Sequence, residues 1–475
     1  MGARTEHRGR GATILDSMSG ADQDHRSPGG GGVALHRSGG VTDARVAAAE
    51  ICADLRGGEL LDPSFDRRTA RLDARDRRWV RELVYGMLRR RSRLDAYLDA
   101  RVRGGTVRLD ADLLDLLRLG AAQLLQMESV PAYAAIAQTV ELAKQRHGLG
   151  ASKLANAVLR RLDRERDSLT LPTLADPIAA LALEGSHPQW LVARWAERWG
   201  LADTRRLLEA NNREAPLVAR PYHAVREQLE AMLESAGVHI EDAPLAKDSI
   251  VLSSPVSSLT DLGPFRQGLF HLQDPASTLV TQYACVPTGA TVADLCAAPG
   301  GKAVELSRNA GQVFASDGSF ARLQRVLENA KRLEISTMYS YVADARMPAI
   351  RPVDLVLVDA PCTGTGTFRR HPDARWRLKI SDVAVMAALQ RSILKAAANV
   401  VKPGGILVYS TCSLEREEND EQIDRFLIEH PGWKVDPPPE GVVPAAAMDD
   451  GLLRVLPQRH GTDGAFAARL RRPAA

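Results

Sequence analysis

The feature that most constrains the fold is a change of rhythm at about residue 266 of this 475-residue chain. From there to the C-terminus, short apolar runs alternate with segments of helical periodicity. Alternating strands and helices predict an open parallel sheet that helices cover on both faces. The strand-like runs are TVADLCA (291–297), QVFASD (312–317), MYSYVAD (338–344), VDLVLVDA (353–360) and GILVYSTCS (405–413).

A glycine-rich turn follows the first of these runs, in DLCAAPGGK (294–302). Ala298, Gly300 and Gly301 allow backbone to approach a ligand closely, and the start of the next helix favours anionic groups. The turn has neither the Walker spacing nor the dinucleotide pattern G-x-G-x-x-G. A generic tight turn would explain the glycines alone, but the whole nonapeptide is more specific.

Two acids follow the next two strands, where ligands of such sheets bind. Asp317 ends the second strand and is placed to accept hydrogen bonds from ribose hydroxyls, whereas Asp344 ends the third and could meet an adenine amino group. Either acid alone would also fit a helix N-cap. Together with the glycine turn they predict a nucleoside pocket.

The chain has 5 cysteines, and no Cys-x-x-Cys pair supports a zinc site or a disulfide framework. A reduced cytosolic protein without a metal site is therefore expected. Cys52, Cys285 and Cys296 fit the small buried hydrophobe that free cysteine usually is. Cys362 follows the fourth strand, as does Asp359, and Cys412 follows the fifth. Two thiols facing one pocket suggest chemistry such as C5 methylation of a pyrimidine, in which a thiolate adds at C6. Position alone leaves either cysteine as the nucleophile.

The rest of the chain divides by composition. Residues 1–40 are rich in Gly, Ser, Arg and His and predict a disordered tail, and 41–165 predict an all-helical domain with breaks at VPAY and HGLG. A linker is expected at 166–185, a small α/β middle domain at 186–265 and the sheet domain at 266–475. Trp190, Trp195 and Trp199 fit a hydrophobic core better than a ligand-stacking surface.

The net charge of +3 hides a basic segment between Arg67 and Arg103, with thirteen arginines and five acids. Arginine suits phosphate contact, although such a run is more often a solvated helix face. No run approaches the roughly 20 apolar residues of a membrane helix, and the N-terminus has no secretory signal pattern.

Four separated motifs carry a resemblance. DLCAAPGGK, DAPCTGTGTFRRHPDARW, YSTCSLEREEND and DGAFAARL are similar to those of the Sun/Fmu family of RNA cytosine-5 methyltransferases. LLRLGAAQLL, VPAYAAIAQTVELAK and NAVLRRL resemble the NusB-type RNA-binding domain of the bacterial small-subunit enzymes. The resemblance implies an all-α NusB-like N-terminal domain, the small α/β domain and a Rossmann-like class I methyltransferase domain. The segment NNREAPLVARPYHAV departs from the family pattern after its proline, and the tail lies outside it.

The resemblance also implies roles for particular residues. Cys412 would be the nucleophile, Cys362 would help release the product, and Asp359 would lie between cofactor and cytosine, at N3. Asp317 and Asp344 would hold the ribose and adenine of S-adenosylmethionine (SAM). Arg369, Arg370 and His371 are placed in RRHPD to meet RNA phosphates; His371 could instead be a general base, although a structural histidine is the simpler interpretation. The SAM loop would comprise Cys296, Ala297, Ala298, Pro299, Gly300, Gly301 and Lys302.

The resulting prediction is a cytoplasmic, monomeric enzyme that methylates C5 of a cytosine in small-subunit (16S) ribosomal RNA. The same chemistry on transfer RNA is one alternative. A non-catalytic RNA-binding or antitermination protein is another, and the intact cysteines, Asp359 and glycine turn argue against it. A purine N6-methyltransferase would need Pro-Pro-aromatic after the fourth strand, where this chain has Asp-Ala-Pro-Cys.

Overall fold

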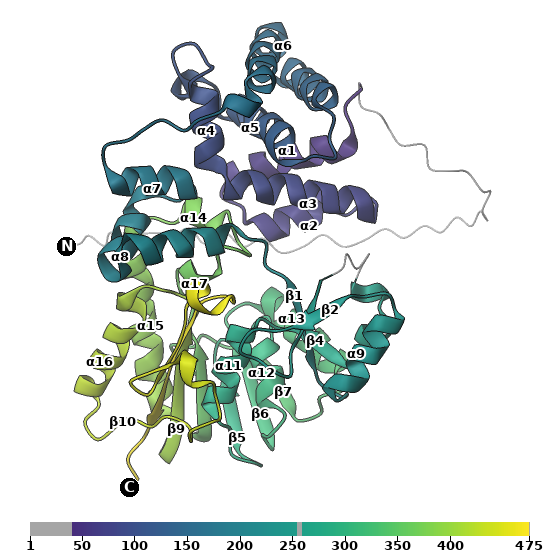
Figure 1. Cartoon of the computed structure of the whole chain (residues 1–475). Coiled ribbons are helices and arrows are strands. Elements are labelled where there is room, and N and C mark those ends of the chain that lie inside the picture. Colours follow the sequence, from purple (N-terminus) through teal and green to yellow (C-terminus); the bar gives the residue numbers. More distant parts are fainter. Residues whose placement is uncertain (1–39, 254–258, 475) are drawn as a thin grey trace, which may run out of the picture. The chain divides into compact units, whose positions relative to one another are not determined.

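A computed structural model describes residues 40–253 and 259–474 (Figure 1). The predicted tail, except for Gly40, lies outside the described residues. The predicted three-part architecture of helical domain, small mixed domain and large sheet domain is confirmed. No helix of the described residues is long and apolar enough to cross a membrane.

The N-terminal part is entirely helical from Asp43 to Arg164 (Figure 1). Aspartates begin two of its helices by accepting backbone N–H groups, Asp73 from Asp76 and Asp110 from Asp112. Apolar side chains from all six α-helices meet in one core. Both expected breaks occur, one between α5 and α6 and the other as a kink at Gly148 within α6. The helices are α1 (Asp43–Arg56), α2 (Leu61–Thr69), α3 (Ala74–Arg89), α4 (Arg91–Asp99), α5 (Ala111–Gln126) and α6 (Ala132–Arg164).

Two packed helices follow, α7 (Pro177–Gly185) and α8 (Gln189–Asn212). The first lies inside the segment 166–185 predicted to be a linker. It is part of the packed structure, because its apolar face packs on α8. Trp195 is buried against Phe368, which confirms it as a core residue, and Trp190 and Trp199 pack at the edge of the same cluster.

The small domain contains an antiparallel sheet with strand order β2-β3-β1-β4. Its strands are β1 (Leu217–Pro221), β2 (Ile240–Asp242), β3 (Ile250–Leu252) and β4 (Phe270–Leu272), with α9 (Arg226–Ser235) and α10 (Gly263–Arg266) beside them. Since β4 pairs with β1, this sheet extends past the predicted boundary at 265/266.

The large sheet has nine strands within the described residues. The order is β11-β12-β13-β9-β8-β5-β6-β7, with β10 (Lys434–Val435) beside β13. The five predicted strands are parallel: β5 (Thr291–Asp294), β6 (Gln312–Asp317), β7 (Met338–Val342), β8 (Val353–Asp359) and β9 (Val401–Thr411).

The expectation of a wholly parallel sheet is wrong at its C-terminal edge. There β13 (Ala465–Arg471) runs antiparallel to β9 and covers its edge, and β12 (Leu452–Val455) and β11 (Met448–Asp449) extend the sheet. Hydrophobic clusters fill both faces, as predicted. One face carries α11 (Pro275–Ala284), α12 (Gly301–Leu306) and α13 (Phe320–Arg332), and the other carries α15 (Ile380–Asn399) and α16 (Asp420–Glu429).

Candidate active site

The two cysteines predicted to be functional lie side by side. Strands β8 and β9 are parallel neighbours in which Asp359 is paired with Ser410, so the loops after them begin at the same level. Cys362 and Cys412 follow within three residues, and their Sγ atoms are 3.4 Å apart. The two thiols can therefore share one proton.

A close backbone contact fixes the two loops against each other. Gly366 N donates to the carbonyl oxygen of Cys412 at 2.9 Å. A Cβ at position 366 would lie 2.7 Å from that oxygen and 2.8 Å from Gly464 Cα, so only glycine fits. The second glycine of DAPCTGTG thus has a steric reason that the sequence alone does not give.

Glu418 also holds the two loops together. Its buried carboxylate accepts hydrogen bonds from Thr363 N at 2.9 Å, Ser413 Oγ at 2.6 Å and Gln390 Nε2 at 2.8 Å. Thr363 follows one cysteine and Ser413 the other, so one acid fixes both. Burial raises the pKa of Glu418. No role was predicted for it, although it lies within the motif YSTCSLEREEND.

The surroundings of the two thiols differ in charge. The hydrogen bond with Cys412, followed by burial and the charge of Glu418, raises the pKa of Cys362 well above its ordinary value. Lys302 lies near Cys412, and the charge of the Cys412 sulfur contributes to raising the pKa of Lys302. Cys412 lines the main cavity of the site, and Cys362 is not among the residues that line it. A ligand in the cavity would therefore meet Cys412 and not Cys362.

Lys302 and Asp359 form an ion pair at the floor of the site. Lys302 Nζ lies 2.7 Å from Asp359 Oδ2, and Ser410 Oγ donates to Asp359 Oδ1 at 2.9 Å. Burial lowers the pKa of Lys302, but the Asp359 carboxylate outweighs it and the pKa is raised. Asp294, at the end of β5, is fully buried nearby. Burial, with the charge of Asp359, raises its pKa to about 7. The glycine-rich motif predicts no role for Asp294, because its burial without an ion-pair partner among the described residues is a property of the fold.

The predicted SAM loop forms one wall of a cavity of about 550 Å³. Gly300 has φ of +111°, and a Cβ there would lie 3.2 Å from Val326 Cα, so the turn needs glycine. Two buried polar atoms at this cavity, Gln273 Nε2 and Asp294 Oδ2, have no hydrogen-bond partner among the described residues. A cavity of this size with unused polar atoms fits a nucleoside-type cofactor. The loop residues in its wall are Cys296, Ala297, Ala298, Pro299, Gly301 and Lys302.

The two predicted nucleoside-binding acids are not among the residues that line this cavity. Asp317 is buried at the end of β6, where it accepts from Ser319 N and Arg322 Nη2, both at 2.9 Å. Asp344 follows β7 and binds Arg346, whose hydrogen bonds lower the pKa of Asp344 to about 2. Cofactor contact by either acid stays a prediction.

Arg369 and Arg370 take part in a buried network with two aspartates. Arg369 reaches Asp463 at 2.5 Å and Asp274 at 2.7 Å, and Arg370 reaches the same two acids at 2.5 and 2.6 Å. The Arg369 side chain is only 7% exposed, so this geometry gives no support to phosphate contact by Arg369. Arg370 lines the cavity, as does His371.

His371 connects the segment that follows Cys362 to the helical domain. Its Nδ1 lies 3.1 Å from Asp62 Oδ2 of α2, and Asp62 raises the pKa of His371 against the opposing effect of burial. Trp376 Nε1 donates to Leu88 O at 2.8 Å, at the end of α3. The segment that follows Cys362 is therefore fastened to the N-terminal domain, which argues for a structural role of this histidine beside any role in binding.

Known proteins resemble this chain over nearly all of its length. The sequence profile of the 16S rRNA methyltransferase RsmB/F matches residues 286–471, that of the NusB family 42–164, and that of the RsmF/B-like ferredoxin-like domain 187–258. The crystal structure of PH0851 superposes with a TM-score of 0.75 at 27% identity, covering 90% of this chain and 99% of that chain.

Two curated relatives show the same extent of similarity. The ribosomal RNA small subunit methyltransferase B of Vibrio cholerae is 34% identical over 443 residues, covering 89% of this chain and 99% of that protein. A probable enzyme of the same name from Synechocystis is 34% identical over 448 residues, covering 91% of this chain and 100% of that protein. Identity at this level over nearly the full length of these relatives assigns the family. Family membership implies SAM as cofactor and RNA as substrate. This chain belongs to the RsmB/F family of 16S rRNA methyltransferases.

Proposed function

We propose that this chain methylates C5 of a cytosine in small-subunit ribosomal RNA through a covalent bond between Cys412 and C6 of the base. The observation that carries the proposal is the cysteine pair, 3.4 Å apart, of which only Cys412 lines the cavity. C5 of cytosine is a poor nucleophile until a thiolate adds at C6, so a thiolate in the cavity is what this reaction needs. The target base would have to leave its stack to reach it.

Cys412 is proposed as the nucleophile on electrostatic grounds. Lys302 stabilises a negative charge on Cys412, and the Cys362 thiol, whose pKa is raised, can donate its S–H to the same sulfur. Both effects favour the Cys412 thiolate. Cys362 faces Glu418 instead, and its own thiolate would be opposed by that carboxylate.

Asp359 is proposed to bind the pyrimidine ring at N3. As the C6–S bond forms, electron density moves through C5 and C4 to N3, and a proton delivered to N3 neutralises that charge. Lys302, whose Nζ lies 2.7 Å from Asp359 Oδ2, would supply that proton through the Asp359 carboxyl group. The ion pair with Lys302 and the hydrogen bond from Ser410 fix the orientation of Asp359. SAM would be held by residues 296–302, with Asp317 and Asp344 proposed for its ribose and adenine, and it supplies the methyl group when bound.

Cys362 is proposed to act at product release. After a base removes the C5 proton, the C6–S bond breaks and its electron pair returns to Cys412. A protonated thiol 3.4 Å away lowers the free energy of that leaving thiolate by hydrogen bonding. Removing Cys362 would therefore slow elimination more than addition. Arg370 and His371, at the cavity wall, are proposed to meet the RNA backbone there, and the protein is proposed to act as a monomer.

The reaction is tested by incubating the protein with methyl-labelled SAM and unmodified 16S ribosomal RNA, with transfer RNA in parallel. The RNA is then digested to nucleosides and separated by mass. Labelled 5-methylcytidine from the ribosomal RNA alone is the expected product. Label in another nucleoside would refute the C5 assignment, and label only in transfer RNA would refute the substrate.

A further inference from the structure

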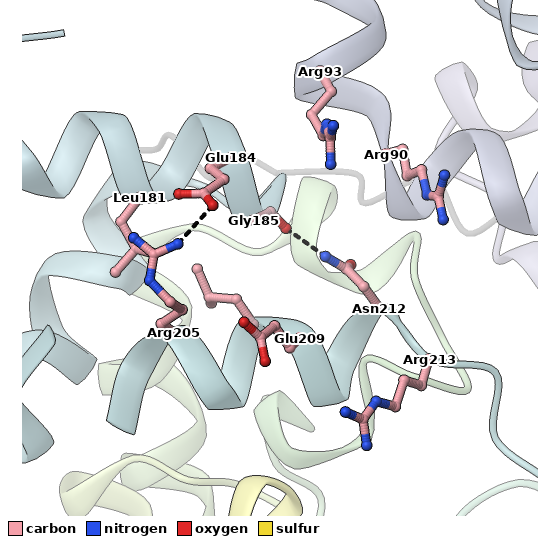
Figure 2. Close-up of a pocket in the computed structure, with 10 residues that line it drawn as sticks. Arg90, Arg93, Leu181, Glu184, Gly185, Arg205, Glu209, Asn212 and Arg213 are labelled. Atoms are coloured by element: carbon pink, nitrogen blue, oxygen red, sulfur yellow. Dashed lines mark hydrogen bonds and ion pairs between the residues drawn. The ribbon is translucent and has the colours of Figure 1, made fainter. Parts of the chain in front are cut away.

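A second cavity, of about 500 Å³, lies between the helical domain and the helix pair α7–α8, outside the site described above (Figure 2). Arg90 and Arg93 reach it from the start of α4, and Arg205 and Arg213 from α8 and its end. Glu184 and Glu209 are the acids in its wall. Its arginines therefore outnumber its carboxylates by two to one.

Three of these arginines have no ion-pair partner among the described residues. Arg205 is paired with Glu184 at 2.6 Å, on one side of the view in Figure 2. Arg90, Arg93 and Arg213 form no ion pair with any of the described residues, and Figure 2 shows them on the other side. Burial, and then the charge of Arg93, lowers the pKa of Arg90. Arg90 and Arg213 are exposed, so guanidinium groups without an ion-pair partner are open here to an anion from solvent.

Some of their neighbours in the basic segment 67–103 differ from them in having ion-pair partners. Arg67, Arg68, Arg77 and Arg101 are each paired with acids of the helical domain. Their charges are neutralised by these acids, which agrees with the interpretation of a solvated helix face. Arg90 and Arg93 of this segment have no such partner in the part of the chain that the structure describes, and the cavity brings them together with Arg213.

The walls of this cavity are held in place by hydrogen bonds. Ser92 N, at the start of α4, donates to Ser186 Oγ at 2.9 Å, which joins the helical domain to the end of α7. Asn212 Nδ2 donates to Gly185 O at 2.7 Å (Figure 2). Asn212 Oδ1 accepts from Arg375 Nη1 at 2.7 Å. Arg375 is fully buried in the segment that follows Cys362, so the cavity wall is hydrogen-bonded directly to that segment.

We propose that this cavity binds backbone phosphates of the substrate RNA, with Arg90, Arg93 and Arg213 as their ligands. The inference rests on the proposed function for the identity of the RNA. A strand held there is bound by the helical domain and by α8 together, and α8 is connected through Asn212 to Arg375. The site would then supply affinity and register for the RNA, with no part in the chemistry.

The test compares two triple variants that lose the same charge. One is Arg90→Gln/Arg93→Gln/Arg213→Gln. The control is Arg325→Gln/Arg351→Gln/Arg425→Gln, three exposed arginines of the methyltransferase domain that form no ion pair with described residues. Binding of in vitro transcribed 16S ribosomal RNA is measured over a range of KCl concentrations, and methyl transfer is measured against RNA concentration. SAM affinity and circular dichroism establish that both variants fold.

The cavity variant is expected to bind RNA at least about tenfold more weakly and to lower the slope of log K against log salt by about 2, since each lost phosphate contact removes about 0.7–0.9. KM for RNA rises while kcat and SAM affinity stay at wild-type values, and the control changes little. RNA affinity and slope equal to the control would overturn the inference, and such a cavity would then suit an acidic protein partner. Failure of the proposed function is distinguishable, because the wild-type protein would then bind RNA without methylating it.

Discussion

Replacing Lys302 by methionine removes the ammonium group on which the electrostatics of the proposed site depend. Two Lys–Asp pairs of the same length, 2.7 Å, allow the effect to be worked out. The side chains of Lys302 and Asp359 are 16% and 30% exposed, and those of Lys402 and Asp354 are 46% and 40% exposed. Breaking a buried pair costs about 3–5 kcal/mol because one charge is left uncompensated, whereas exposed pairs contribute about 0–1 kcal/mol.

Lys302→Met is therefore expected to lower the free energy of unfolding by about 3 kcal/mol, the low end of that range, since the pair is not fully buried. Lys402→Met, the matched control, should cost under about 1 kcal/mol. Urea unfolding followed by circular dichroism gives both values, using the transition that added SAM shifts, because that one reports the methyltransferase domain. Equal losses for the two variants would refute the claim that burial gives the Lys302–Asp359 pair its weight.

Three further predictions concern charged groups near the site. Burial, and then the charge of Asp359, raises the pKa of Asp294 from 3.8 to about 7. Between these two values the folded protein holds a proton that the unfolded chain releases. The Asp294 carboxyl therefore destabilises the fold increasingly as pH rises through that window. The stability of Asp294→Asn relative to wild type should therefore grow between pH 4 and pH 7 in urea titrations; a constant difference would contradict this. Arg369→Met leaves Asp274 and Asp463 with one guanidinium between them and should cost about 3 kcal/mol, part of which Asp463→Asn in the same chain should restore; a loss as small as that of an exposed pair would count against the network. Asp62→Asn should lower the pKa of His371, measured by NMR titration of its imidazole protons, and an unchanged titration would mean that the contact between α2 and the segment that follows Cys362 does not form in solution.

Local patterns in the sequence were enough to predict the parallel strands of the sheet domain. The apolar runs that became β5, β6, β8 and β9 are each short, bounded and followed by polar residues, and those features depend on neighbours in the chain. The pairing of Cys362 with Cys412 follows from two runs becoming adjacent parallel strands. Strand order is a property of the whole sheet, so sequence could suggest this contact without establishing it.

What could not be predicted depends on contacts between distant segments. Arg369 follows Cys362 in sequence and is predicted to contact RNA phosphate. The structure instead pairs it with Asp274 and Asp463, which lie 95 and 94 residues away in the sequence. The motif DGAFAARL does not reveal that β13 runs antiparallel, because its direction is decided by pairing with the edge of β9. Glu418 resembles any acid of its polar segment until its partners from three separate places are known.

The division of labour between the two cysteines is tested most directly by trapping the adduct. Wild type, Cys412→Ala, Cys362→Ala and the double variant are each incubated with labelled 16S ribosomal RNA and SAM, denatured, and separated by gel electrophoresis. The account predicts a covalent protein–RNA band that accumulates in Cys362→Ala and is absent from both variants that lack Cys412. Accumulation in Cys412→Ala instead would exchange the two roles, and no band in any variant would contradict a covalent mechanism.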